Sequence, residues 1–396
     1  MFKNIEMAPA DPILGLTDAF KKDTSSGKIN LGVGVYKDDT GITPILESVK
    51  KAEKIIYAEE KTKSYLGIAG TEEFGKLVRE LIFTKESKVI KENRAVTVQS
   101  PGGTGALRIA ADFIHKFLPN AKIWLSNPTW ANHNKVFNAA GIETSSYTYY
   151  NTETKGLNFD GMIEDLSKIP AGDVVLIHAC CHNPTGVDIA SEQWAKVAEI
   201  SKQQGFLVLF DFAYQGFGHG IDEDAVGIRL FASKIRNFMV ANSFSKNFGL
   251  YNERIGSLTV VTDTDTEAKN VFSQLKICVR GNFSNPPAHG SSIVTKILSD
   301  PYLYELWKNE VTAMRNRINS NRTILVDTLK AKGIKQDFNF INKQRGMFSY
   351  TGLTKEQVLE LRNKFSVYMV NSGRISLAGL SSKNIDAFCE AVAEVL

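Results

Sequence analysis

The sequence has no large excess of one charge and no apolar run long enough to cross a membrane. It contains 47 Lys and Arg residues against 43 Asp and Glu residues in a chain of 396. An excess this small, spread along the chain, does not favour nucleic acid or an anionic membrane as a partner. A membrane-spanning helix needs roughly 18 or more consecutive apolar residues, and no run approaches that length. With 43% hydrophobic and 23% charged residues, the composition predicts a soluble globular protein.

Features of targeting segments and of disulfide-rich proteins are also missing. The N-terminal stretch MFKNIEMAPADPILG contains neither the apolar region of a secretory signal nor an Arg-rich amphipathic pattern, so we expect no such segment. Only 4 cysteines are present, which is too few for a disulfide framework in a chain of this length. Two of them, Cys180 and Cys181, are adjacent, and a bridge between neighbours would be strained. We therefore expect free thiols and a cytoplasmic protein.

The stretch HACCH, His178–His182, contains residue types that bind metals. Its spacing matches no zinc pattern, because its first and last residues alternate along a predicted strand. We expect packed thiols here and no metal.

What the sequence does contain is a repeated order of short apolar run, polar turn and amphipathic stretch. In SEQWAKVAEISKQQG, for example, Trp194, Val197 and Ala198 have helical spacing, and Gly205 closes the predicted helix. Strands that alternate with helices predict an α/β fold with a mainly parallel sheet, covered by helices on both faces. The apolar runs are Val96–Val98, Ile123–Leu125, Val174–Ile177, Phe206–Phe210, Phe238–Ala241 and Ser257–Val261.

The pattern changes after about residue 310. TKEQVLELRNKF begins with Thr354 and Gln357 at the spacing of a capping box. Short strand-like pieces, GMFSY and VYMV, flank this predicted helix, and SSKNIDAFCEAVAEVL reads as a closing helix. The C-terminal part therefore predicts a smaller α+β domain.

One lysine raises a question, because Lys246 follows the apolar run NFMVA in the stretch NSFSKNFGLYNER. An ammonium group is costly to desolvate, so lysine is rarely buried without a partner. Either Lys246 points to water or a ligand meets it there.

Other polar residues follow strands of the same predicted sheet. Asp211 ends an apolar strand in FLVLFDFAYQGF, where a carboxylate needs a partner; a structural ion pair or a helix cap is the simpler explanation, and a cationic heterocycle is the functional one. Tyr214 lies three residues further on. Asn183, in CCHNPTG, is explained equally well by a turn. Gly102, with the glycines after it in SPGGTGALR, starts a helix whose N-terminus suits a phosphate, although such turns are common and match no nucleotide motif.

These residues share one possible ligand, since ligands bind at the carboxyl ends of strands in such sheets. An aldehyde-bearing phosphorylated pyridine, pyridoxal phosphate, would use all of them. Lys246 would form a Schiff base, and Asp211 would keep the ring nitrogen protonated. Tyr214 and Asn183 would steady the 3-oxygen of the ring. The glycine loop and Arg254 would bind the phosphate.

Six motifs together resemble those of the class I aminotransferases of fold type I, the aspartate aminotransferases in particular. The resemblance runs from APADPILGL, Ala8–Leu16, to the last helix. It implies a large pyridoxal-phosphate domain with a seven-stranded-type sheet over residues 46–310. A small α+β domain would comprise residues 13–45 and 311–396, after an N-terminal arm of residues 1–12. The motifs are SFSKNFGLYNERIG, DFAYQGF, CCHNPTG, GGTGALR, NPTWANH and GRISLAG.

The resemblance also implies a role for each matching residue. Lys246 would form the Schiff base and move the substrate proton, and Asp211 would bind the pyridinium. His133 would support Asp211, and Trp130 would stack on the ring. Tyr65 would reach the phosphate of a neighbouring subunit. The other matches are Tyr214 and Asn183 at the 3-oxygen, and Gly103, Thr104, Ser243, Ser245 and Arg254 at the phosphate.

Two arginines would read the substrate according to the same resemblance. Arg374 would bind the α-carboxylate, with Gly34 lining the site. Arg280 would reach across a homodimer to the distal carboxylate of aspartate or glutamate. Ordinary surface arginines are the alternative, against which the neighbouring apolar and glycine residues argue. Ala131 departs from the pattern, because proline is expected after the tryptophan.

The resemblance therefore implies an aspartate aminotransferase that exchanges amino groups between aspartate and 2-oxoglutarate through pyridoxal phosphate. An aromatic aminotransferase, alone or as a second activity, shares nearly all these residues, but Thr104 and Asn285 fit the aspartate pattern better. A lyase or decarboxylase would not need Arg280. A non-catalytic binding protein would not need Lys246 together with Asp211.

Overall fold

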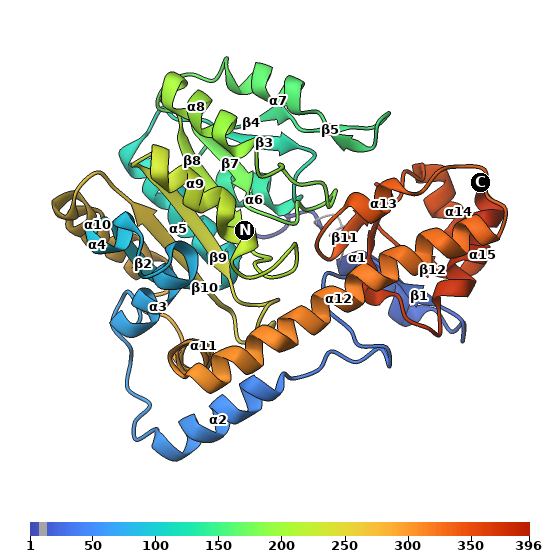
Figure 1. Ribbon diagram of the computed structural model, residues 1–396, viewed down its shortest axis with the longest axis horizontal. Coiled ribbons are helices and arrows are strands. Elements are labelled where there is room, and N and C mark those ends of the chain that lie inside the picture. Colours follow the sequence, from blue (N-terminus) through green and yellow to red (C-terminus); the bar gives the residue numbers. More distant parts are fainter. Residues whose placement is uncertain (8–13) are drawn as a thin grey trace. The chain divides into compact units, whose positions relative to one another are not determined.

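The computed structural model describes residues 1–7 and 14–396 (Figure 1). The expected N-terminal arm, residues 1–12, lies partly outside the described residues, as does the start of APADPILGL. The chain forms two compact units, one made of residues 44–316 and the other of residues 1–43 and 317–396. The domain boundaries expected from the sequence stay a prediction.

The larger unit is built on a seven-stranded sheet with the strand order β2-β10-β9-β8-β7-β3-β4. Neighbouring strands are parallel except at β10, which is antiparallel to both β2 and β9. The expected α/β fold with a mainly parallel sheet is therefore confirmed. The strands are β2 (Ala95–Pro101), β3 (Ile123–Asn127), β4 (Thr144–Thr148), β7 (Val174–His178), β8 (Leu207–Phe212), β9 (Phe238–Ser243) and β10 (Ile255–Val261), and a separate pair is formed by β5 (Tyr150–Asn151) and β6 (Gly156–Leu157).

Helices cover the two faces of this sheet (Figure 1). On one face, Leu209 and Met239 pack with residues of α5 (Gly102–Phe117), α6 (Asn132–Ala139) and α10 (Asp265–Asn282) in a single core cluster. On the other face, Phe210 contacts Trp194 of α8 (Trp194–Gln204) and Phe231 of α9 (Val226–Lys234). Because successive side chains of a strand point to opposite faces, this alternation buries each central strand on both sides.

The remaining helices of the larger unit follow the turn and capping signals of the sequence. Helix α8 begins at Trp194 and ends before Gly205, whose φ of 77° closes the helix as expected. The others are α2 (Glu47–Glu59), α3 (Glu72–Phe83), α4 (Lys88–Lys91), α7 (Phe159–Leu166), α8 (Trp194–Gln204), η1 (Glu223–Ala225), α9 (Val226–Lys234) and α11 (His289–Ser299); α12 (Pro301–Ala331) contributes residues to both units.

The smaller unit contains short strands and helices. Thr354 and Gln357 form the predicted capping box at the start of α14, because the side chain of each residue accepts a hydrogen bond from the backbone N–H of the other. No helix in the described residues has the length and apolar character needed to cross a membrane. The elements are α1 (Leu14–Lys22), β1 (Ile29–Asn30), α13 (Phe340–Lys343), β11 (Phe348–Tyr350), α14 (Lys355–Phe365), β12 (Val367–Tyr368), β13 (Arg374–Ser376), η2 (Leu377–Gly379) and α15 (Ile385–Val395).

Candidate active site

The carboxyl ends of five strands, β2, β3, β7, β8 and β9, meet at one edge of the large sheet. At this edge His178 of β7 is in register with Asp211 of β8, and Asp211 is in register with Ala241 of β9. Asp211 lies two residues after Leu209, so its side chain is on the sheet face that α5 and α6 cover. The fold therefore directs this carboxylate toward α6, which carries His133.

Asp211 is held by a histidine from that helix. Nε2 of His133 lies 3.1 Å from Oδ2 of Asp211, and Nδ1 lies 2.8 Å from Oγ1 of Thr129. Because a carboxylate only accepts hydrogen bonds, Nε2 of His133 carries a proton and donates it to Asp211. His133 is fully buried and Asp211 is 7% exposed. The family resemblance predicted the contact between His133 and Asp211. Thr129 extends this row of hydrogen bonds by one residue that was not predicted.

The surroundings of Asp211 keep it ionised. Burial alone would raise the pKa of this carboxyl, but the hydrogen bond from His133 and the positive charge of Lys246 hold it below its ordinary value. His178 approaches the same oxygen at 3.8 Å. Burial lowers the pKa of His178 to about 4, so at neutral pH this ring is neutral. The site thus contains a buried carboxylate whose negative charge suits a cationic ligand.

Lys246 lies in the turn after β9, on the same edge. Its ammonium nitrogen is 4.9 Å from the centre of the Tyr214 ring, which follows β8. The turn is anchored because the Asn247 side chain donates to the carbonyl of Gln215 at 3.2 Å, and Trp307 donates to the carbonyl of Asn247 at 2.7 Å. Burial lowers the pKa of Lys246 to about 8 even though the charge of Asp211 raises it. A partly neutral amine near physiological pH can act as a nucleophile or a base.

This lowered pKa predicts a pH-dependent stability difference in the cofactor-free protein. The pKa of Lys246 falls from 10.5 to about 8 on folding, so the folded state disfavours the ammonium form. Below pH 8 this destabilises the fold, and the effect disappears as the pH rises toward 10.5. Lys246→Met should therefore raise the free energy of unfolding by about 1–3 kcal/mol at pH 7, with a smaller gain at pH 9.5. Urea unfolding at both pH values measures this.

The control for this experiment is Lys196→Met, which removes an exposed lysine from α8. Its effect on the free energy of unfolding should be small and the same at both pH values. A gain in Lys246→Met that did not depend on pH would mean that better packing, and not removal of the charge, stabilises the variant.

A phosphate-sized anion could be bound where β2 passes into α5. Gly102, the first residue of this helix, has a φ of 75°, and a Cβ there would lie 2.4 Å from Nη2 of Arg254. Only glycine therefore lets the guanidinium approach the helix N-terminus. Arg254 itself has a φ of 54° and donates to Oγ of Ser245 at 3.4 Å. Ser243 lies beside Gly103, whose added Cβ would be 3.0 Å from that of Ser243. Helix amides, hydroxyls and a guanidinium thus face one place.

Trp130 and Asn183 also lie at this edge, in the segments that follow β3 and β7. The indole of Trp130 meets the ring of His133 edge-on, with 5.3 Å between the ring centres. Asn183 is 6% exposed. At the position where proline was expected, Ala131 has a φ of −55°, close to the value that a proline ring imposes. The exchange therefore leaves the backbone before α6 in the conformation that proline would favour.

The smaller unit positions Arg374 in a stack of its own. Arg374, the first residue of β13, is 4% exposed and donates to the carbonyl of Gly32 at 2.7 Å. Its guanidinium lies 4.2 Å from the centre of the Phe348 ring. Gly34 faces the same ring, and a Cβ on Gly34 would lie 2.6 Å from Phe348. The predicted pair Arg374 and Gly34 therefore meets around Phe348, which the sequence did not single out.

Tyr65 and Arg280 are exposed and stand apart from these groups. Tyr65 is 92% exposed, and Arg280, near the end of α10, donates to the hydroxyl of Ser284. Neither contacts the other predicted site residues within the chain, as far as the described residues go. Exposure of both is what a role in a neighbouring subunit requires.

Cys180 and Cys181, from the HACCH stretch, lie near Asp224, and the three side chains could together hold an ion. Both oxygens of Asp224 already accept backbone bonds from the loop after β8, from Gly216 at 2.8 Å and His219 at 2.7 Å. These bonds explain Asp224 as a cap of that loop. The four cysteines are free thiols.

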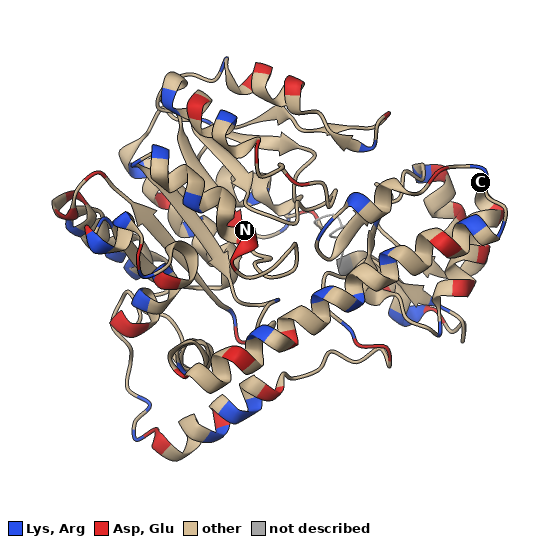
Figure 2. Ribbon diagram, in the orientation of Figure 1, with Lys and Arg blue, Asp and Glu red and all other residues tan. Residues whose placement is uncertain are grey.

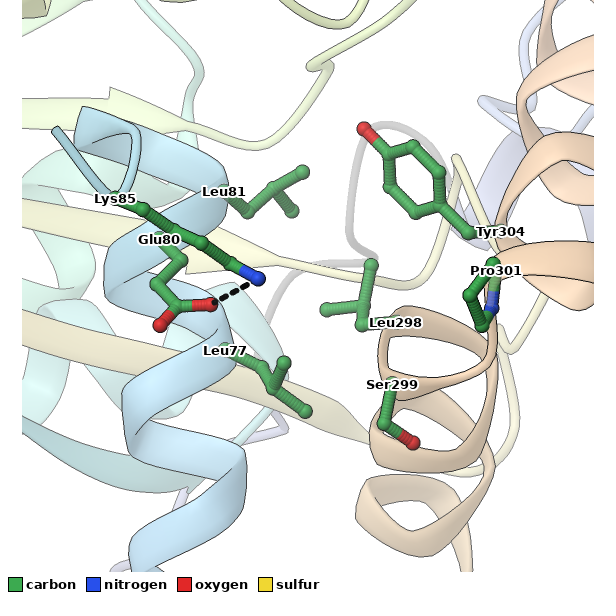
Figure 3. Close-up of a pocket in the computed structure, with 8 residues that line it drawn as sticks. All are labelled: Leu77, Glu80, Leu81, Lys85, Leu298, Ser299, Pro301 and Tyr304. Carbon is green, nitrogen blue, oxygen red and sulfur yellow. Dashed lines mark ion pairs between the residues drawn. The ribbon is translucent and has the colours of Figure 1, made fainter.

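A pocket of about 290 Å³ lies elsewhere in the larger unit (Figure 3). Leucines from α3 and the end of α11 line it, and Tyr304 closes one side. Its charged members, Glu80 and Lys85, pair with each other at 3.8 Å. None of the predicted site residues lines this pocket.

The chain is similar to known proteins over its whole length. The family model described as aminotransferase class I and II matches residues 26–392, and the chain belongs to this family. Within the family, aspartate aminotransferase of Escherichia coli is 54% identical over 396 residues, which is 100% of both chains. An aromatic-amino-acid aminotransferase of Pseudomonas aeruginosa is 47% identical over 100% of this chain and 98% of its own.

A solved structure has the same fold. It is an aromatic-amino-acid aminotransferase from Burkholderia pseudomallei, covalently bound to pyridoxal phosphate, with a TM-score of 0.98 and 48% identity. The similarity covers 100% of this chain and 99% of that one. The family resemblance predicted from the six motifs is confirmed.

Proposed function

We propose that the chain is a pyridoxal-phosphate enzyme that transfers the amino group between L-aspartate and 2-oxoglutarate, giving oxaloacetate and L-glutamate. The observation that carries the proposal is the grouping of Lys246 with the buried pair of Asp211 and His133 at one sheet edge. Relatives named aspartate aminotransferase, 54% and 55% identical over the whole chain, support the choice of substrate.

The residues present fit pyridoxal phosphate. The cradle at Gly102 leaves no room for a Cβ and combines helix amides with Arg254, as a phosphate requires. Asp211 is an ionised carboxylate in a buried position, which suits a protonated ring nitrogen. Lys246 supplies an amine with a pKa of about 8. Each part of the molecule therefore has a chemically matched side chain.

Each residue then has a defined task. When bound, pyridoxal phosphate supplies an aldehyde that condenses with amines and a ring that accepts the electrons of a broken Cα–H bond. Nζ of Lys246 would take the proton from the substrate Cα and deliver it to the 4′ carbon of the cofactor, the carbon of its aldehyde. Asp211 keeps the ring nitrogen protonated, and His133 keeps Asp211 ionised and oriented. Tyr214 and Asn183 bind the 3-oxygen, and Trp130 stacks on the ring.

A separate group of residues holds the phosphate of the cofactor, and two arginines hold the substrate. Arg374 binds the α-carboxylate, and its stack on Phe348 beside Gly34 fixes the plane of its guanidinium for a bidentate contact. Arg280 binds the distal carboxylate. The phosphate residues are Gly103, Thr104, Ser243, Ser245, Arg254 and, from the neighbouring subunit, Tyr65.

The functional unit that we propose is a homodimer in which each chain lends Tyr65 and Arg280 to its partner. Two further apolar side chains are unusually exposed nearby in the sequence, Tyr57 at 89% and Ile277 at 55%. Association would cover these side chains if they belonged to one contiguous apolar patch. Free cysteines fit the cytoplasm as its location. Both signs of charge occur along α2 and α12, which fits amino and keto acids as partners and not nucleic acid or membrane (Figure 2).

Substrate choice is tested by replacing Arg280 and assaying transamination of aspartate, tyrosine and phenylalanine with 2-oxoglutarate. Arg280→Ala should lower kcat/KM for aspartate by about a hundredfold or more, because losing one partner of a desolvated ion pair costs roughly 3–5 kcal/mol. Phenylalanine has no distal carboxylate and should lose far less.

The matched control is Arg374→Ala, which should impair every substrate because all carry an α-carboxylate. Equal losses for aspartate and phenylalanine in Arg280→Ala would contradict the dicarboxylate assignment. An aromatic aminotransferase is the second candidate, since two of the similar proteins carry that name. Wild-type kcat/KM higher for phenylalanine than for aspartate would favour it.

A further inference from the structure

Two segments at the sheet edge carry side chains that the proposed function places on the cofactor ring. The segment after β3 carries Trp130, and the segment after β7 carries Asn183. His182 precedes Asn183 and is 1% exposed. In the sequence His182 stands out only as the last residue of the HACCH stretch, and the proposed function gives it no task.

Both ring nitrogens of His182 make short hydrogen bonds. Nδ1 lies 2.8 Å from Oγ1 of Thr185, within the same segment. Nε2 lies 2.9 Å from Oγ of Ser126, in β3 just before the other segment begins. The ring also stacks on Tyr149 with 4.0 Å between centres and an interplanar angle of 13°. His182 is therefore packed on its face and bonded at both edges.

The donor and acceptor of each hydrogen bond of His182 follow from the other bonds that Thr185 and Ser126 make. The backbone N–H of Val187 donates to Oγ1 of Thr185 at 3.1 Å, so the Thr185 hydroxyl donates onward to Nδ1. The hydroxyl of Ser126 donates to the carbonyl of Pro128 at 2.9 Å, so Ser126 accepts from the N–H at Nε2. The ring thus carries one proton, on Nε2. Burial lowers the pKa of His182 well below its ordinary value, which agrees with a neutral ring.

The segment that carries Asn183 is fixed from its other side as well. The carboxylate of Asp188 accepts the backbone N–H groups of Cys181 and His182, both at 2.8 Å. Cys181 has a φ of 53°, an unusual conformation that these bonds help to hold. The backbone is thus locked within its own segment, and the His182 ring connects it to the neighbouring segment.

We propose that His182 is a positioning residue, which joins the Asn183 segment to the Trp130 segment through Ser126 and so fixes the amide and the indole relative to each other. This inference rests on the proposed function, because it assumes that both side chains meet the cofactor ring. Its physical basis is the bond between His182 and Ser126, whose hydroxyl in turn donates to Pro128 in the Trp130 segment. Losing that bond lets the segments move independently, even if each keeps its own internal bonds.

Three variants separate the crossing bond from the local one. Ser126→Ala removes the crossing bond and leaves His182 unchanged. His182→Asn keeps a polar group near Nδ1, facing Thr185, but is too short to reach Ser126. His182→Gln places an amide near Nε2 and keeps a donor toward Ser126. The first two should therefore behave alike, and His182→Gln should restore the wild-type behaviour.

The main measurement is the pH titration of the absorbance of bound pyridoxal phosphate. An amide donor at the 3-oxygen favours the deprotonated form, so displacing Asn183 should raise the titration midpoint. We expect a rise of about 0.5–1 pH unit in Ser126→Ala and His182→Asn, with kcat/KM about fivefold to tenfold lower. His182→Gln should keep the wild-type midpoint and most of the activity.

A second readout uses the cofactor-free protein. Thermal unfolding of Ser126→Ala, His182→Asn and the double variant forms a double-mutant cycle, and the crossing bond predicts that the effects on Tm are less than additive. Additive effects would contradict the bond. A lower Tm with an unchanged titration midpoint in both single variants, or equal midpoints in His182→Asn and His182→Gln, would overturn the positioning role.

The titration also separates this inference from the proposed function. A wild-type protein without cofactor absorbance would contradict the proposed function and this role together. A wild-type protein with normal absorbance and activity, and variants with unshifted midpoints, would contradict the positioning role alone.

Discussion

Replacing Lys246 with alanine is expected to abolish transamination while leaving pyridoxal phosphate bound. The amine of Lys246 is the nucleophile and the base of the proposed mechanism, and its pKa of about 8 suits both tasks. Without it, the Cα proton has no acceptor at the right place, and kcat should fall by about 10⁴-fold or more. The cradle at Gly102 and the carboxylate of Asp211 are untouched, so dialysis should still retain the cofactor.

Mixed dimers give this prediction a control for folding. Lys246→Ala chains should regain activity when they exchange subunits with Arg280→Ala chains. One site of each mixed dimer then has its own Lys246 and borrows an intact Arg280 from the partner. Recovery would show that Lys246→Ala chains are correctly folded. Wild-type turnover by Lys246→Ala alone would refute the assignment, and no recovery under demonstrated exchange would place Arg280 in its own chain's site.

The sheet illustrates what the sequence reveals and what it hides. The central strands could be predicted because they are buried on both faces and are largely apolar. Strand β4 could not be predicted from an apolar run because Thr144–Thr148 reads TSSYT. As the last strand of the order it pairs only with β3 and tolerates polar side chains. The antiparallel direction of β10 was also hidden, since a fully buried strand looks the same in either direction.

The site shows the same division between sequence and structure. Lys246 and Asp211 could be singled out because charged groups directly after apolar strands need a partner. Thr129 and Phe348 could not, because a hydroxyl or an aromatic ring is common in any sequence. Their roles depend on which side chain the fold places beside them. His178 stands out in the sequence only as the first residue of the HACCH stretch. That stretch raises the question of a metal site and does not indicate a contact with Asp211.

Asp211 is the second residue whose loss should have a very large effect. Asp211→Ala should lower kcat/KM for aspartate by a few hundredfold to several thousandfold, since removing one partner of a buried ion pair costs about 3–5 kcal/mol. The ring nitrogen of the cofactor would lose its proton, and with it the ability of the ring to accept electrons. Asp211→Glu keeps a negative charge and should retain more activity than Asp211→Ala.

The chain offers a matched control in Asp224, another buried aspartate at the same edge of the larger unit, 5% exposed against 7% for Asp211. Its oxygens accept backbone bonds only, so Asp224→Ala should lower Tm and leave kcat/KM of the folded enzyme within a few-fold of wild type. Asp211→Ala should differ from Asp224→Ala in its effect on activity. It removes the carboxylate that faces the ring nitrogen of the cofactor, so its loss of kcat/KM should far exceed that of Asp224→Ala. If Asp211→Ala and Asp211→Glu were equally active and near wild type, Asp211 would serve only as an ion pair with His133, and the electron-accepting ring would need another source for its proton.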